Sequence, residues 1–182
     1  LLAEMLRAAG KTCWVGGNIG KPLLPEVGRM APSDWAVVEL SSFQLMDMDR
    51  SGHIAVVTNL APNHLDVHKD MAEYVEAKEH VFAYQSEGDI LILNRDHEIT
   101  RSFAPGAPGQ VRWFSRRERP ERGVFLEDGV IYRATPEGVR EIMRKGIFCC
   151  RGCTTWKTIW PHWPPWRGWS PMRQGPAGGQ DL

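Results

Sequence analysis

Short apolar runs alternate along this chain with segments of helical periodicity. Trp35–Leu40, His53–Thr58 and Asp89–Leu93 are nearly continuous apolar runs, which is typical of strands in a parallel sheet covered on both faces. Val111–Ser115 is a further strand of the same kind. The pattern predicts an α/β fold with a mostly parallel sheet flanked by helices.

The two ends of this region add a helix and a hairpin. Leu1–Ala9 has apolar residues on one helical face and is followed by Gly10, a natural C-cap, and Lys11–Val15 then predicts a short strand. Val124–Leu126 and Val130–Tyr132 flank the turn sequence E-D-G, which predicts a small antiparallel hairpin beside the sheet.

The segment from Met71 to Tyr84 is predicted to be a helix with a lysine on its apolar side. At roughly 100° per residue, Lys78 lies between Tyr74 and Phe82 in one row of side chains. A lysine there either extends its stem over the edge of the core or points into a site. Because burying a bare ammonium is costly unless it is paired or chemically altered, we favour a functional lysine.

Polar side chains follow two of the predicted strands. Glu39 ends the first apolar run, and His64 lies in the loop after His53–Thr58. Since open α/β sheets bind ligands at the carboxyl ends of their strands, both are candidate site residues. Asp66 and His68 in the same loop are equally compatible with a structural role.

Glycines make up most of the stretch G-G-N-I-G at Gly16–Gly20. The stretch is compatible with a backbone that closely approaches a ligand, and equally with a plain turn in which Asn18 is left-handed.

Composition excludes several classes of function. The 182 residues carry no formal net charge and no dense basic run, so we expect neither nucleic acid nor a membrane as a partner. Hydrophobic residues make up 42% and charged residues 24%, as in ordinary globular domains. Four cysteines are too few for a disulfide framework, and we expect a cytoplasmic location.

After Gly146 the apolar pattern is lost. Five of the eight tryptophans fall between Trp156 and Trp169, interleaved with prolines. Back-translating Ile147–Trp166 and reading one base earlier turns Cys149 and Cys150 into leucine. In the same shifted frame, Cys153–Thr158 becomes compatible with M-H-N-V-E-N. We infer a frameshift at or just before Ile147.

This frameshift sets the predicted domain boundaries. Residues 1–146 form one domain, and residues 147–182 form a tail that we expect to be disordered. The C-x-x-C pattern at Cys150 and Cys153 has no second pair and no strand-to-helix context, so we assign it no metal.

Four motifs together with the frame-restored H-N-V-E-N resemble the Mur ligase family, over roughly Leu1–Gly146 and within its central, P-loop NTPase-like ATPase domain. The seven-residue motif at Glu39 is the most specific, because sister ligases and folylpolyglutamate synthases differ after that glutamate. It resembles the branch of the family that adds D-glutamate. The motifs are G-G-N-I-G at Gly16–Gly20, E-L-S-S-F-Q-L at Glu39–Leu45, N-H-L-D-V-H at Asn63–His68 and E-A-K-E-H-V-F at Glu76–Phe82.

The resemblance implies roles for five residues. Glu39 corresponds to the carboxylate that binds the Mg²⁺ bridging the ATP phosphates. His64 corresponds to a ligand of a second Mg²⁺, and Lys78 to a lysine that carbon dioxide converts into an anionic carbamate beside that metal. Asn18 and Ser41 correspond to residues that line the site for the nucleotide substrate.

The same resemblance implies the reaction and its partners. ATP phosphorylates the carboxylate of UDP-N-acetylmuramoyl-L-alanine, and the amine of D-glutamate then displaces phosphate from the acyl phosphate. Two Mg²⁺ ions neutralise the crowded oxygens. We expect the whole enzyme to be a monomer.

The chain also departs from the family. The phosphate loop G-x-x-G-K-T/S is expected just before Leu1, and the flanking N- and C-terminal domains are missing, so we expect a truncated chain that is inactive alone. Two alternatives stay open, a sister ligase that adds another amino acid and a non-catalytic remnant that keeps the fold. Asn63 stands where many relatives have aspartate.

The inferred frameshift predicts what the genomic DNA encodes. Resequencing from upstream of Leu1 through Trp169 is expected to give an open frame with G-K-T ahead of Leu1 and H-N-x-E-N after Gly146. Retention of the present frame in resequenced DNA or in homologous genes would contradict the inference.

Overall fold

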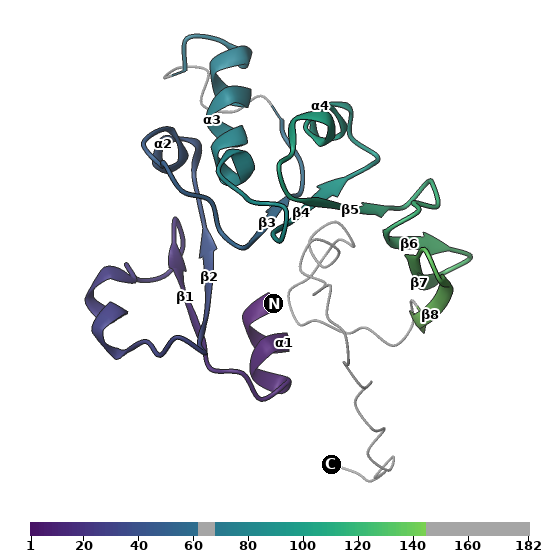
Figure 1. Cartoon of the computed structure of the whole chain (residues 1–182), viewed down its shortest axis with the longest axis horizontal. Coiled ribbons are helices and arrows are strands. Elements are labelled where there is room, and N and C mark those ends of the chain that lie inside the picture. Colours follow the sequence, from purple (N-terminus) through teal and green to yellow (C-terminus); the bar gives the residue numbers. More distant parts are fainter. Residues whose placement is uncertain (62–67, 145–182) are drawn as a thin grey trace, which may run out of the picture.

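The computed structural model describes residues 1–61 and 68–144 of the chain (Figure 1). Helices and strands alternate through most of this region, as the apolar pattern predicts. In order, the elements are α1 (Leu2–Ala8), β1 (Cys13–Gly17), η1 (Leu24–Arg29), β2 (Trp35–Glu39), α2 (Ser42–Met46), β3 (Ile54–Val57), α3 (Met71–Ala83), β4 (Ile90–Asn94), α4 (Glu98–Ser102), η2 (Ala104–Gly106), β5 (Gln110–Ser115), β6 (Gly123–Glu127), β7 (Val130–Thr135) and β8 (Gly138–Arg144).

The strands form two sheets. β1 and β2 pair in parallel, with Cys13 opposite Trp35 and Gly17 opposite Glu39. The second sheet has the order β3-β4-β5-β6-β7-β8, parallel from β3 to β6 and antiparallel from β6 to β8. The predicted mostly parallel sheet with an antiparallel annex is therefore confirmed.

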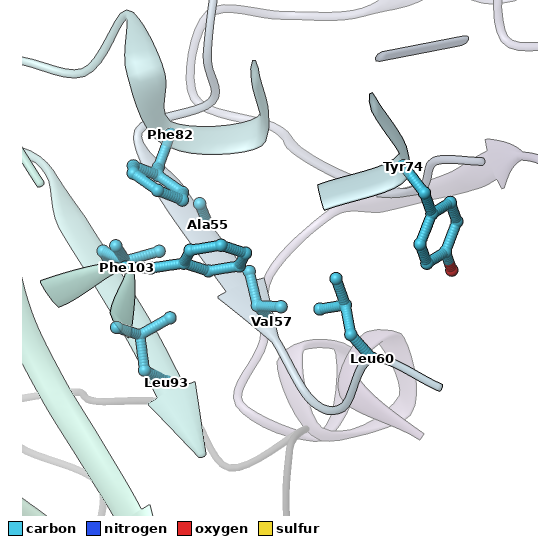
Figure 2. Close-up of a cluster of buried hydrophobic side chains, with 8 residues drawn as sticks. Ala55, Val57, Leu60, Tyr74, Phe82, Leu93 and Phe103 are labelled. Carbon is cyan, nitrogen blue, oxygen red and sulfur yellow. The ribbon is translucent and has the colours of Figure 1, made fainter. Parts of the chain in front are cut away.

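The main core lies between the second sheet and helices α3 and α4. Alternation along β4 directs Leu91 and Leu93 to this face, where both are fully buried. Figure 2 shows Phe82 of α3 and Phe103 beside Val57 and Leu93, and the two phenylalanine ring centroids are 5.4 Å apart. The other face of β4 packs Ile92 against Phe114 and Ile131, so this strand is covered on both faces as expected.

The predicted burial of β2 on both faces is wrong for the described part of the chain. Trp35 and Val37 face α1 and pack with Leu6, whereas Ala36 and Val38 point to the opposite face and are exposed. Within residues 1–61 and 68–144, β2 pairs with a single strand. Val38 on its outer face is 45% exposed. An apolar run therefore predicted the strand correctly but not what covers it.

The antiparallel annex is larger than the sequence pattern indicates. Asp128 and Gly129 both adopt positive φ (47° and 75°), as a tight hairpin turn between β6 and β7 requires. The sequence pattern did not predict β8, whose apolar and charged residues do not alternate cleanly, or the two five-residue helices α2 and α4.

The expectations for the C-terminal tail fall outside the described residues. The proposed tail, with its frameshift and its C-x-x-C pattern, occupies residues 147–182.

Of the helices in residues 1–61 and 68–144, none has the length and apolar character needed to cross a membrane.

The packing of Phe103 predicts a large contribution to stability. This side chain is 2% exposed, so Phe103→Ala leaves a cavity and is expected to lower the free energy of unfolding by about 3–5 kcal/mol. Urea denaturation followed by circular dichroism measures the loss. Val139→Ala on β8, where the side chain is 57% exposed, is the control and should change stability by less than about 0.5 kcal/mol. Similar effects from the two substitutions would contradict the core assignment.

Candidate functional site

The site is built around the C-terminal end of β2, where Glu39 is exposed. Asn18, which follows β1, lies directly beside it. The backbone N–H of Asn18 donates to the Glu39 carbonyl oxygen at 2.7 Å, and its side-chain amide Nδ2 donates to Glu39 Oε1 at 3.5 Å. The parallel register of β1 and β2 thus brings together two residues that are 21 positions apart.

The glycines before Asn18 allow this approach. Gly17 has φ of +100°, and a Cβ built on it would collide with the Glu39 carbonyl oxygen. A side chain at Gly17 would therefore push the Asn18 loop away from Glu39. The close approach of two backbone segments therefore explains why position 17 is a glycine, and no ligand is needed for that explanation.

Ser41 begins helix α2 as its N-cap. Its Oγ accepts from the backbone N–H of Gln44 at 3.3 Å, and its own backbone N–H donates to Gln44 Oε1 at 2.9 Å. This reciprocal pair is a capping box, and the pattern S-x-x-Q in the sequence is its local signal. Ser41 therefore holds the start of α2 in place, two residues after Glu39.

Lys78 reaches this region from helix α3. Its Nζ donates to the carbonyl oxygen of Leu40 at 3.3 Å, and it lies 5.8 Å from the centroid of the Tyr74 ring. Tyr74 and Phe82 are buried on either side, so the predicted position of Lys78 within the apolar face is confirmed. The lysine points toward the end of β2 instead of extending into solvent.

The surroundings of Lys78 shift its protonation equilibrium toward the neutral amine. Burial removes the ammonium from water and lowers the pKa of the Lys78 amine below its usual value, while the negative charge of Glu39 opposes the shift by raising that pKa. Desolvation is the larger effect. A lysine with a lowered pKa is a better nucleophile near neutral pH than a solvated one.

The described site residues supply part of a hard-cation site. Glu39 offers carboxylate oxygens, which Mg²⁺ prefers, and an amine converted into a carbamate would offer two more. Within residues 1–61 and 68–144 there is no cluster of three or more histidine, cysteine or acidic side chains that could hold a metal ion. His64, with its neighbours Asn63 and Asp66, lies outside the described residues and stays a prediction.

Two histidines contact α2 in ways that the sequence did not predict. His68 is buried, and its Nε2 is 2.8 Å from Ser42 Oγ. His80 Nδ1 is 2.9 Å from the Leu45 carbonyl oxygen. Both contacts join residues far apart in sequence, so no local pattern could have indicated them.

Comparison with known proteins assigns this chain to a family. Residues 1–128 match the family described as the Mur ligase middle domain. UDP-N-acetylmuramoylalanine–D-glutamate ligase of Acetivibrio thermocellus is 49% identical over 144 residues, which are 79% of this chain and 31% of that protein. The ligase of the same name from Clostridium kluyveri is 51% identical over 126 residues, which are 69% of this chain and 28% of that protein.

A solved structure of MurF from Acinetobacter baumannii is similar over 78% of this chain and 40% of that chain, with 14% identity and a TM-score of 0.44. The chain spans about a third of the length of the curated relatives described above. The family match covers well over half of the 182 residues and includes Glu39, Ser41 and Lys78. The chain belongs to the Mur ligase family, and its matched residues are those of the family's middle domain.

Proposed function

We propose that this chain is the ATP-using domain of a ligase that joins D-glutamate to UDP-N-acetylmuramoyl-L-alanine. The observation that carries the proposal is the 49–51% identity with D-glutamate ligases over a segment in which Lys78 Nζ donates to the carbonyl oxygen of Leu40, the residue after Glu39. Since the chain spans about a third of those relatives, the activity belongs to the whole enzyme and not to this segment alone.

Lys78 is proposed to act after modification by carbon dioxide. The neutral Nζ forms a bond to the carbon of CO₂ and loses a proton, which leaves an anionic carbamate. This reaction requires the uncharged amine, and the lowered pKa of Lys78 supplies more of it near neutral pH. The carbamate replaces the half-buried ammonium by an anion, and a bound cation would offset the cost of burying that charge.

The remaining groups are proposed to hold charge at fixed positions. The Glu39 carboxylate would hold one Mg²⁺, and the Lys78 carbamate together with His64 would hold a second. Bound Mg²⁺ would neutralise the oxygens of ATP and of the substrate carboxylate. Asn18 positions the Glu39 carboxylate, because its side-chain amide donates to Oε1. Asn18 and Ser41 are also proposed to contact the nucleotide substrate.

A chimaeric enzyme tests this function. Residues 1–144 replace the matching segment of the Acetivibrio thermocellus ligase, which supplies the rest of the enzyme. Release of ADP is expected only when ATP, UDP-N-acetylmuramoyl-L-alanine and D-glutamate are all present. A coupled ADP assay measures the rate, with L-glutamate and D-alanine as control amino acids.

The outcomes separate the alternatives. Release of ADP without ligated product, or no release from a folded chimaera, would favour the non-catalytic remnant. Because the C-terminal part of the chimaera comes from the donor enzyme, the amino acid that the natural protein adds is read from its own full gene. Activity of the 182-residue chain alone would contradict the expectation that it is inactive.

Lys78 gives the sharpest prediction for a single side chain. Lys78→Met in the chimaera is expected to lower the rate by about 100-fold or more, because a fixed charge at the reacting groups is lost. The thermal midpoint of the 182-residue chain should stay equal or rise, since the variant no longer buries an ammonium. Wild-type activity should also fall as the pH is lowered, because protonating the amine reverses carbamate formation.

The exposed Lys11 provides the control for this substitution. Lys11→Met should leave both the rate and the midpoint unchanged. A Lys78→Met chimaera that keeps its activity would show that the lysine has no part in the reaction.

A further inference from the structure

His68 is a buried histidine that the proposed reaction does not use. Its side chain is 3% exposed, and its Nε2 is hydrogen-bonded to Ser42 Oγ at 2.8 Å. The Ser42 side chain is equally covered, with 2% of the residue exposed. The carboxylate of Glu73 lies 3.9 Å from His68 Nδ1, beyond hydrogen-bond distance. Among residues 1–61 and 68–144, Ser42 therefore provides the close polar contact of this ring.

Aromatic packing fixes the orientation of the His68 ring. The ring stacks on Phe43 with a centroid distance of 5.1 Å and an interplanar angle of 5°. Tyr74 meets it edge-on, with a centroid distance of 5.3 Å. Tyr74 is also the ring over which the Lys78 ammonium lies. A continuous series of contacts thus runs from Ser42 through His68 and Tyr74 to Lys78.

The two ends of this series are the two sides of the candidate site. Ser42 is the first residue of α2, adjacent to Ser41 and three residues after Glu39. Lys78 lies on α3 and donates to the Leu40 carbonyl oxygen. His68 precedes α3, whose N-cap is Asp70. The His68 ring therefore joins the segment that follows β2 to the helix that carries the lysine.

Because His68 and Ser42 are both buried, loss of the hydrogen bond between them is costly. A buried hydroxyl or imidazole nitrogen without a partner costs about 1–3 kcal/mol, so losing either member leaves the other unsatisfied. The ring is too well covered to touch a substrate or a metal ion directly. Its effect on a reaction must pass through the residues that it holds.

We propose that His68 is a positioning residue, which fixes the Glu39–Ser42 segment relative to Lys78 through its hydrogen bond to Ser42 and its packing on Tyr74. The effect on ligation rests on the function proposed above, whereas the effect on the structure does not. Removing the hydrogen bond should loosen the start of α2 and misplace Glu39 relative to Lys78. Turnover should then fall even though the protein stays folded.

Three substitutions separate the hydrogen bond from the packing. His68→Phe keeps a ring between Phe43 and Tyr74 but has no polar atom, and Ser42→Ala removes the other partner. His68→Gln places an amide nitrogen near the position of Nε2 and can restore the bond. His80→Phe is the matched control, because His80 also bonds α2, at the Leu45 carbonyl oxygen, and packs edge-on against Tyr84.

Hydrogen–deuterium exchange of the 182-residue chain is the first readout. His68→Phe and Ser42→Ala are expected to speed amide exchange in residues 41–44 by about tenfold, the factor that corresponds to one hydrogen bond of ordinary strength. His68→Gln should stay within about twofold of the unmodified chain. His80→Phe should affect residues 45–51 instead. Unchanged exchange in residues 41–44 of both His68→Phe and Ser42→Ala would overturn the proposal.

Turnover of the chimaera is the second readout. We expect His68→Phe to lower kcat about tenfold with little change in the KM for ATP, and His68→Gln to recover most of the rate. The double variant with Ser42→Ala should be no slower than either single variant, because both remove one bond. A double variant whose loss of kcat is the product of the two single losses would overturn the proposal. So would a loss of kcat in His80→Phe equal to that in His68→Phe when the two variants have the same thermal midpoint.

The two proposals fail in different ways. A chimaera without D-glutamate-dependent turnover contradicts the proposed function, and the exchange experiment on the 182-residue chain still decides the role of His68. An active chimaera whose His68→Phe variant is equally active contradicts the positioning role alone. If His68→Phe does not fold, Ser42→Ala, which deletes a single oxygen atom, gives the same comparison.

Discussion

The arrangement of the described elements depends on the hydrogen bond between the half-buried Lys78 amine and a backbone carbonyl oxygen. Lys78 lies in the apolar face of α3, where it cannot be fully hydrated, and its Nζ donates to the Leu40 carbonyl oxygen just past the end of β2. The helix also contacts the segment after β2 through His80 and through Ser51, whose hydroxyl donates to the His80 carbonyl oxygen at 2.9 Å. Among the described elements, α3 thus contacts both α2, which follows β2, and β3 of the six-stranded sheet (Figure 1).

Packing and chemistry make opposite demands on this lysine. Its neighbours Tyr74 and Phe82 belong to the core, and their burial stabilises the position of α3. The same burial weakens the charged form of the amine, and only part of this effect is offset by Glu39. A core that tolerates such a residue gives up stability at one point, as binding and catalytic sites commonly do.

The sequence predicted most of what depends on local patterns. The periodicity around Lys78 gave both the helix and the unusual position of the lysine, and the E-D-G turn gave the hairpin. Prediction from the sequence failed where contacts between distant residues determine which side chains are buried. The apolar residues of β2 indicated a fully covered strand, yet Ala36 and Val38 are exposed.

The contacts of His68 show the limit most clearly. Its bond to Ser42 spans 26 residues, and the ring that stacks on it comes from Phe43 in another element. No pattern within a window of ten or twenty residues carries this information. By contrast, the capping box of Ser41 and Gln44 is entirely local and could have been read from S-x-x-Q.

The exposed side of β2 has a consequence for the chain in solution. Within residues 1–61 and 68–144, no strand pairs with the second edge of β2, and Ala36 and Val38 expose apolar side chains on its outer face. An unprotected edge next to an apolar surface is a template for strand addition from another molecule. A charged residue in place of Val38, which is 45% exposed, would oppose such strand addition without removing a core contact.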